Sequence, residues 1–264
     1  MFPILLAAIA IFNGKDVPDC VKLPAPGTNF RPNVATATTA PWVDSNGWRI
    51  ARAEGKKFCY DVPKDRVVLA MAEADAHHAD AIIKFPPEDQ PLFDKMTAFL
   101  QKIGPGPTHD LGDIAVKEDG SPIAGETLNL FTRRNLTFRI VGANDPKALM
   151  NVTVDSSIKD PNEFTYSIRQ KLTDEKRLIR VYGSETVLAN LTGDGKHVRI
   201  HLVNYGRRGA DGLRVRVRGS YQIEQSAFFD NDSKAEEYTV TDGGTEFSIP
   251  HIDVYGVVDL IAKP

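Results

Sequence analysis

Two tryptophans, Trp42 and Trp48, lie within the short segment PWVDSNGWR and are the only tryptophans in the chain. Beside them stand Asp44, Asn46 and Arg49, which supply a carboxylate, an amide and a guanidinium. Aromatic faces next to such groups can stack on a sugar ring and hydrogen-bond its hydroxyls. These five residues, the tryptophan turn, are therefore a candidate carbohydrate site. In the alternative, the indoles fill the edge of a core and the polar residues only shape the turn.

Carboxylates could give the same turn a hydrolytic role. A glycoside hydrolase needs two carboxylates about 5–9.5 Å apart in one cleft. Asp44 would be one of them, and the second acid would come from the α/β segment that follows. Acids are common in the sequence, so no specific pair is assigned as catalytic, and an enzyme that uses such a pair is the alternative function.

A second candidate surface is basic. Residues 197–204 and 212–219 alternate apolar and polar side chains, as strands with one buried face do, and the Gly- and Asn-rich stretch between them predicts a hairpin. Basic residues would then share the outer face as a docking surface for an acidic partner. In the alternative, Glu246, Asp253 or Asp259 on neighbouring strands balance the charge. The basic residues are His197, Arg199, His201, Arg214, Arg216 and Arg218.

No cofactor or metal is expected. The sequence lacks the glycine-rich phosphate loops, the dinucleotide fingerprint and the G-x-S-x-G elbow. The adjacent His77 and His78 point about 100° apart on a helix, so they are more typical of a helix surface or cap than of one metal site. A net charge of −3 argues against nucleic acid as a partner.

The elements that would position these residues fall into two regions. Residues 61–174 alternate strands and helices, which predicts an α/β domain with a mostly parallel sheet. Residues 175–264 predict an antiparallel β-sandwich. The strands expected in the sandwich are 177–182, 185–191, 197–204, 212–219, 221–228, 236–241, 244–249 and 254–261.

The N-terminal part is expected to be simpler. Residues 1–14 are apolar and fit either a signal peptide, which predicts a secreted or periplasmic protein, or a segment cut from a longer chain. Residues 15–60 predict an extended leader that carries the tryptophan turn. Cys20 and Cys59 are the only cysteines, and export would allow one disulfide between them. No integral membrane span is expected.

The order of these segments resembles a known family. The stretches LGDIAVKEDGSP and LNLFTRRNLTFRIV, followed by YGSETVLANLTGDGKHVRIHLVNYG and DVYGVVDL, are similar to the C-terminal half of barrel-type β-galactosidases and related glycoside hydrolases. In that family a catalytic barrel precedes a glutamine-amidotransferase-like domain and a small β-domain. The likeness covers roughly residues 60–264.

The departures from the family decide what the resemblance implies. A catalytic barrel takes about 250 residues, and about 60 precede the α/β segment here. The turn that would carry a nucleophilic cysteine instead contains Glu118, Asp119 and Gly120. The resemblance therefore implies a non-catalytic accessory protein that binds carbohydrate or mediates assembly, as a homo-oligomer or with a glycosidase partner.

Overall fold

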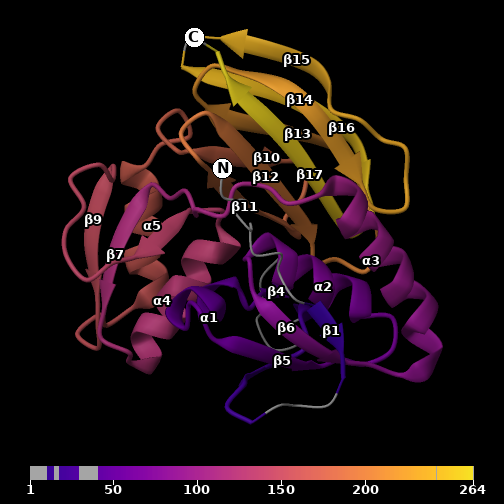
Figure 1. Ribbon diagram of the computed structural model, residues 1–264. Coiled ribbons are helices and arrows are strands. Elements are labelled where there is room, and N and C mark those ends of the chain that lie inside the picture. Colours follow the sequence, from indigo (N-terminus) through magenta and orange to yellow (C-terminus); the bar gives the residue numbers. More distant parts are fainter. Residues whose placement is uncertain (1–10, 15–17, 30–40, 242, 264) are drawn as a thin grey trace, which may run out of the picture.

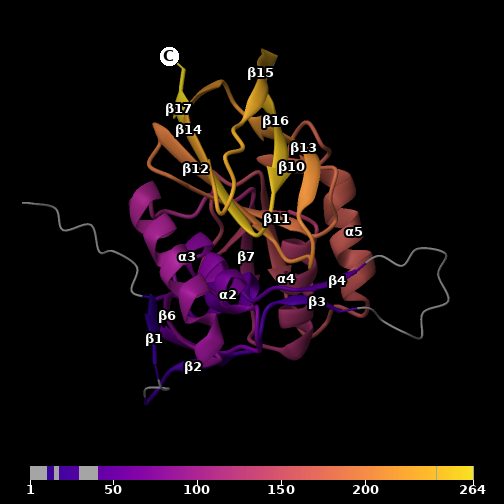
Figure 2. The same cartoon turned by 90° about the vertical axis from the view of Figure 1, so that its right-hand side faces the viewer.

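A two-layer β-sandwich lies across two smaller α/β units in the computed structural model of the chain (Figure 1). The structure describes residues 11–14, 18–29, 41–241 and 243–263. An α/β region followed by an antiparallel sandwich was the fold class expected from the sequence, and the structure confirms it. In both views, the C-terminus and β15 lie at one end of the molecule and β1 lies toward the other (Figures 1 and 2).

The sandwich closes over a core of branched aliphatic side chains and phenylalanines. Its strands begin and end within about two residues of the expected bounds, except that the strand expected at 244–249 continues to Ile252. The first sheet has the order β10 (Ile179–Tyr182), β13 (Ala210–Arg218), β16 (Gly244–Ile252) and β15 (Glu236–Thr241). The second has the order β11 (Val187–Gly193), β12 (His197–Asn204), β17 (Tyr255–Ala262) and β14 (Tyr221–Phe228).

The hairpin expected between β12 and β13 is wrong. The strand β12 pairs with β11 and β17, whereas β13 pairs with β10 and β16, so the connection crosses from one layer to the other. Alternation reports which face of a strand is buried, not which strand lies beside it. Both strands do bury the expected aliphatic residues, but toward the space between the two sheets.

The first α/β unit is a parallel sheet with the order β1 (Ile11–Asn13), β6 (Asp80–Lys84), β5 (Lys57–Asp61) and β2 (Val21–Leu23). Helix α2 (Val67–Ala76) lies between this sheet and the sandwich (Figures 1 and 2). Nearly all of its residues are buried, as a helix covered on both sides requires. A short 3-10 turn (Pro87–Asp89) leads into α3 (Gln90–Ile103), which ends at Gly104 with φ of 65°.

The second α/β unit has the parallel order β8 (Phe138–Ile140), β7 (Ile114–Glu118) and β9 (Met150–Val154). Helices α4 (Pro122–Arg133) and α5 (Pro161–Lys171) accompany it. Both begin with Pro after a capping residue, since Ser121 and Asp160 accept hydrogen bonds from first-turn N–H groups. Two separate sheets thus stand where one was expected, and β9 was not predicted.

Residues 15–60 contribute more than the extended leader that their composition predicts. Besides β2 and β5, they hold the two-stranded pair β3 (Gly27–Asn29) and β4 (Trp42–Asp44) and the short helix α1 (Gly47–Arg52). Strands of three residues are too short to show a period in sequence. Cys20 and Cys59 form a disulfide that ties the start of β2 to β5. Most of residues 1–14 lie outside the described residues, and the division into domains stays a prediction.

Among the described residues, no helix combines the length and apolar character that crossing a membrane requires.

Candidate functional site

A fully buried carboxylate, Glu73 of α2, joins the first α/β unit to the sandwich. It accepts hydrogen bonds from the backbone N–H of Asn46 at 2.7 Å, the Asn46 amide at 2.8 Å, and the hydroxyls of Tyr60 at 3.0 Å and Tyr205 at 2.8 Å. Burial raises the pKa of Glu73, and these four donors oppose the shift. Because no solvent reaches the carboxylate, it braces the structure and is unsuited to proton transfer with a substrate.

A second polar cluster, between α2 and the sandwich, involves Asp75, two residues after Glu73 on the same helix. The Tyr255 hydroxyl donates to Asp75 and, with that proton committed, accepts from the Nδ1–H of His201 at 2.7 Å. Burial lowers the pKa of His201 far below its usual value and lowers the pKa of His77 and His78 to about 4. His77 caps α2, in the cap role expected for this pair. Among the described residues, no three potential ligands gather into a metal site.

The tryptophan turn is split between two surroundings. Trp42 is partly buried on β4, with the Arg133 guanidinium 3.2 Å from its ring centroid. Trp48 packs against the core of the second α/β unit, and the Arg49 guanidinium lies 4.3 Å from its ring centroid. Asn46 is buried against Glu73 rather than turned toward solvent. The five residues are close in sequence, but they do not present two open indole faces with polar groups beside them.

Among the described residues, the contacts of Asp44 are with an amide and two guanidiniums. Its carboxylate accepts from the Asn29 amide, and burial raises its pKa against the opposing charges of Arg133 and Arg49. Glu73 is the acid from the α/β region that interacts electrostatically with the same Arg49. Since Glu73 is fully buried and hydrogen-bonded, these two acids cannot act together on a bound glycoside.

The six basic residues do not share one face, because their strands belong to different sheets. On β12, the Arg199 and His201 side chains are buried, and only His197 is well exposed. On β13, Arg214 and Arg216 pair with Glu246, and Arg218 pairs with Asp113. The balancing acids expected from neighbouring strands are therefore present at Glu246 and Asp259. Asp253 pairs with His251 instead.

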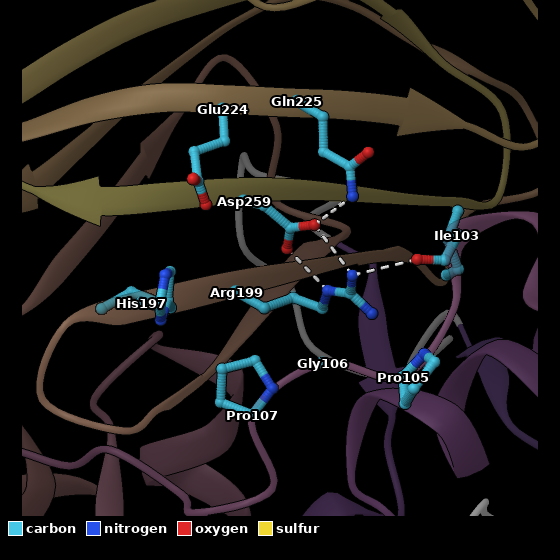
Figure 3. A pocket seen from close by; sticks show the side chains of 10 residues that line it. Ile103, Pro105, Gly106, Pro107, His197, Arg199, Glu224, Gln225 and Asp259 are labelled. Carbon is cyan, nitrogen blue, oxygen red and sulfur yellow. Dashed lines mark hydrogen bonds and ion pairs between the residues drawn. The ribbon is translucent and has the colours of Figure 1, made fainter.

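A polar groove of about 390 Å³ does gather functional groups from separate elements (Figure 3). The loop after α3 forms one wall, and β12, β14 and β17 form the other. Figure 3 shows Pro105 and Pro107 on the loop side and Glu224 and Gln225 on the strand side, with His197 at one end. The lining residues are Ile103, Pro105, Gly106, Pro107, His197, Val198, Arg199, Glu224, Gln225 and Asp259.

The floor of the groove is an arginine–carboxylate pair in a fixed geometry. Arg199 donates from Nε to one oxygen of Asp259 at 2.6 Å and from Nη2 to the other at 2.8 Å. The same guanidinium donates to the carbonyls of Gly104 at 2.7 Å and Ile103 at 3.2 Å. A Cβ on Gly106 would lie 2.8 Å from Arg199 Cδ, so only glycine lets the loop approach this closely. The groove is therefore preorganised by groups that it buries.

Three further polar side chains, Gln225, Glu224 and His197, surround this pair. Gln225 donates its amide to Asp259 at 2.5 Å, and within the described part of the chain its side-chain carbonyl accepts no hydrogen bond. Glu224 is exposed beside the register shift that separates Ile223 from Gln225 in the pairing of β14 with β17, and among the described residues its carboxylate has no ion-pair partner. His197 is 40% exposed and lies 3.1 Å from Asp194. A ligand with several hydroxyls could exchange hydrogen bonds with all three.

The sequence identified His197 and Arg199 as candidate site residues and Asp259 as a candidate balancing acid, but it did not point to the other groove residues. Glu224 and Gln225 are two exposed polar residues in succession, and Pro105 and Pro107 read as a helix terminator. The break in alternation at Glu224 and Gln225 was the one local signal, because a bulge turns adjacent side chains to the same side. The opposing loop lies about 120 residues away in sequence, so nothing local relates it to β14.

Comparisons of the chain by sequence find no relative: no protein-family model matches, and no curated protein matches. Comparison by structure does find similar proteins. The α-L-fucosidase isoenzyme 2 from Paenibacillus thiaminolyticus superposes with a TM-score of 0.58 at 8% sequence identity, covering 82% of this chain and 62% of that one. The chain thus spans less than two thirds of the fucosidase it matches.

Two β-galactosidases match more loosely. A GH42 β-galactosidase from G. stearothermophilus gives a TM-score of 0.41 at 9% identity, covering 92% of this chain and 53% of that one. The enzyme from Rahnella sp. R3 gives 0.40 at 9% identity, covering 89% and 53%. The fucosidase match shows a shared fold and nothing about chemistry. The likeness to glycoside hydrolases holds at the level of the fold.

Proposed function

We propose that this protein is a non-catalytic accessory protein related to glycoside hydrolases, and that it binds carbohydrate without cleaving it. The sugar would lie in the groove between Pro105–Pro107 and strands β12, β14 and β17. The carrying observation is the preorganised Arg199–Asp259 pair beneath exposed acceptors and donors. Sugar sites combine fixed polar groups with an apolar surface for the ring. Here Glu224, Gln225 and His197 are the polar groups, and the two prolines are the apolar surface.

Binding without hydrolysis follows from the state of the two carboxylates in the groove. A glycosidase needs one acid free to give a proton and a second free to attack or activate water. Asp259 uses both oxygens, which accept from Arg199 and Gln225, so among the described residues that line the groove Glu224 is the one acid left to act. Asp44 and Glu73 do not supply a second pair, since Glu73 is buried. The protein would therefore bind glycans and leave the glycosidic bond intact.

The groove can be tested by glycan-array screening, followed by titration calorimetry with the best ligand. Replacing Glu224→Ala should weaken binding about tenfold, the value of one hydrogen bond to a charged group. Glu185→Ala is the matched control, because Glu185 is also an exposed acid on the sandwich but lies outside the groove. A Trp42→Ala, Trp48→Ala double variant should keep its affinity if it folds.

Two results would contradict this function. Loss of binding in the double tryptophan variant, with full binding by Glu224→Ala, would place the sugar on the tryptophan turn. Release of nitrophenol from nitrophenyl glycosides by the parent, abolished in Glu224→Gln, would make the protein a hydrolase. If no glycan binds to the parent, assembly with another copy or with a glycosidase becomes the better reading, and sedimentation of the chain with and without such a partner is the measurement to make.

We propose in addition that the protein is secreted or periplasmic, on the support of the Cys20–Cys59 disulfide. Protein isolated from its natural host without reductant, then denatured, should therefore show no reactive thiol with a maleimide reagent. The same sample treated first with dithiothreitol should show two. Two reactive thiols without reductant would argue for a reducing compartment.

A further inference from the structure

A second cleft, of about 460 Å³, lies where the start of α2 meets the loop that crosses between the two layers of the sandwich. It is separate from the sugar groove and shares no residue with it. Its lining is strongly basic, with three cations and one acid. The lining residues are Pro63, Lys64, Asp65, Arg66, Val68, Leu69, Asn204, Gly206, Arg207 and Val254.

The crossing loop, residues 205–209, is anchored to the sandwich by Asn204 and to α2 by Tyr205. The Asn204 side chain donates to the carbonyls of Arg208 and Asp253 at 2.8 Å each and accepts from Thr186 at 2.8 Å and from the N–H of Gly206 at 3.0 Å. The next residue, Tyr205, is buried and donates its hydroxyl to Glu73 of α2. The backbone next to Arg207 is therefore anchored both to the sandwich and to α2.

Arg66 directly precedes α2 and lines the cleft together with Arg207. Its guanidinium lies over Gly27, where a Cβ would be 3.7 Å from Cζ. The pKa of Arg66 is lowered, first by burial and then by the positive charge of Arg207. Within the described part of the chain, neither guanidinium forms an ion pair, and Asp65 is the lone acid in the lining. Two like charges held toward one cleft cost free energy unless an anion joins them.

We propose that this cleft binds an oxyanion, a phosphate, sulfate or carboxylate group, between the guanidiniums of Arg66 and Arg207. The planar fork of an arginine matches the oxygens of such a group in pairs, so two converging arginines can hold it with four hydrogen bonds. Lys64 adds a third positive charge at the rim. The site goes beyond the proposed sugar groove, because it selects for charge rather than for hydroxyls.

Calorimetric titration of the full chain tests the site with three probes: inorganic phosphate, sulfate and glucuronate, each against chloride at equal ionic strength. At least one probe should bind the parent, and Arg207→Ala should weaken that binding tenfold or more. Arg208→Ala is the matched control, because Arg208 is the exposed neighbour on the same loop and lies outside the lining. Arg207→Lys should bind with intermediate affinity, since it keeps the charge and loses the fork.

The probes also identify the source of the anion. Binding of glucuronate and not of phosphate or sulfate assigns the site to an acidic sugar, and the reverse pattern assigns it to a tetrahedral oxyanion. Binding that Arg207→Ala leaves unchanged, or no binding of any probe, overturns the proposal. Glu224→Ala should bind the anion as the parent does, so a failure of the sugar groove would be seen separately from a failure of this site.

Discussion

Glu73→Ala should lower the free energy of unfolding by about 4 kcal/mol, measured by urea denaturation at pH 7. The substitution leaves four buried donors without their acceptor: the backbone and side-chain N–H groups of Asn46 and the hydroxyls of Tyr60 and Tyr205. Each buried donor left unpaired costs about 1–3 kcal/mol, and removal of one member of a buried charged network costs about 3–5 kcal/mol. The lower end of the summed range is expected, because the tyrosine hydroxyls can turn.

Matched variants separate the lost hydrogen bonds from the lost volume. Glu73→Gln keeps the shape and one acceptor oxygen, so it should cost about half as much as the alanine variant. Tyr205→Phe and Tyr60→Phe each remove one donor and should cost about 1–1.5 kcal/mol apiece. If Glu73→Ala unfolds within 1 kcal/mol of the parent, the network does not hold α2 to the sandwich in the way described.

The second large expected effect is that the free energy of unfolding depends on pH through the protonation of His78. Its pKa is lowered to about 4, first by burial and then by the charge of Arg199. Among the described residues, both ring nitrogens are buried without a hydrogen-bond partner. Because the folded pKa lies below the unfolded value of about 6.5, the neutral ring favours folding. Its contribution is complete above pH 6.5 and is lost as the pH falls through 4, which amounts to about 3 kcal/mol.

His78→Asn is the variant that isolates this contribution. Asparagine does not titrate and tolerates the positive φ of 50° found at this position. Unfolding measured from pH 7 to pH 4 should show the parent losing up to about 3 kcal/mol relative to the variant. The comparison between variants matters because the raised pKa values of Glu73 and Asp75 act in the opposite sense, with stability lost as the pH rises. Parallel curves for the two proteins would contradict the prediction.

The sandwich was the part of the fold most accessible from sequence. Each of its strands carries its own alternation, and a turn residue follows most of them, so eight segments could be placed from local signals alone. The pairing of those strands could not be placed, as β12 and β13 show. Strand β12 has its sequence neighbour β11 on one side, but β17 on its other side and both neighbours of β13, which are β10 and β16, are separated from them by other strands. Packing of α2 and the α3 loop on the outer face of β12 buries Arg199 and His201.

The candidate sites depended even more on contacts between distant residues. The tryptophan turn has the right residue types in nine consecutive positions, but Asn46 turns to Glu73 and Trp48 to the core of the second α/β unit. Nothing local in sequence predicts either direction. The sugar groove and the oxyanion cleft show the opposite case. No local sequence pattern marks their lining residues, but the fold brings these residues together. The partnership of Arg199 with Asp259 was foreseeable as charge balance between strands, but its place at the floor of a groove was not.

The position of β17 affects the order in which this protein can be made. Tyr255–Ala262 is an inner strand, hydrogen-bonded to β12 on one side and β14 on the other, and its Tyr255 also reaches Asp75 on α2. During synthesis β12 therefore waits for about 50 further residues before its second neighbour emerges. Until then β12 and β14 each expose an unpaired edge, and Arg199 lacks its Asp259 partner. We expect chaperones to bind the nascent chain at this stage. A chain that stops before Tyr255 should be insoluble rather than fold into a smaller stable protein.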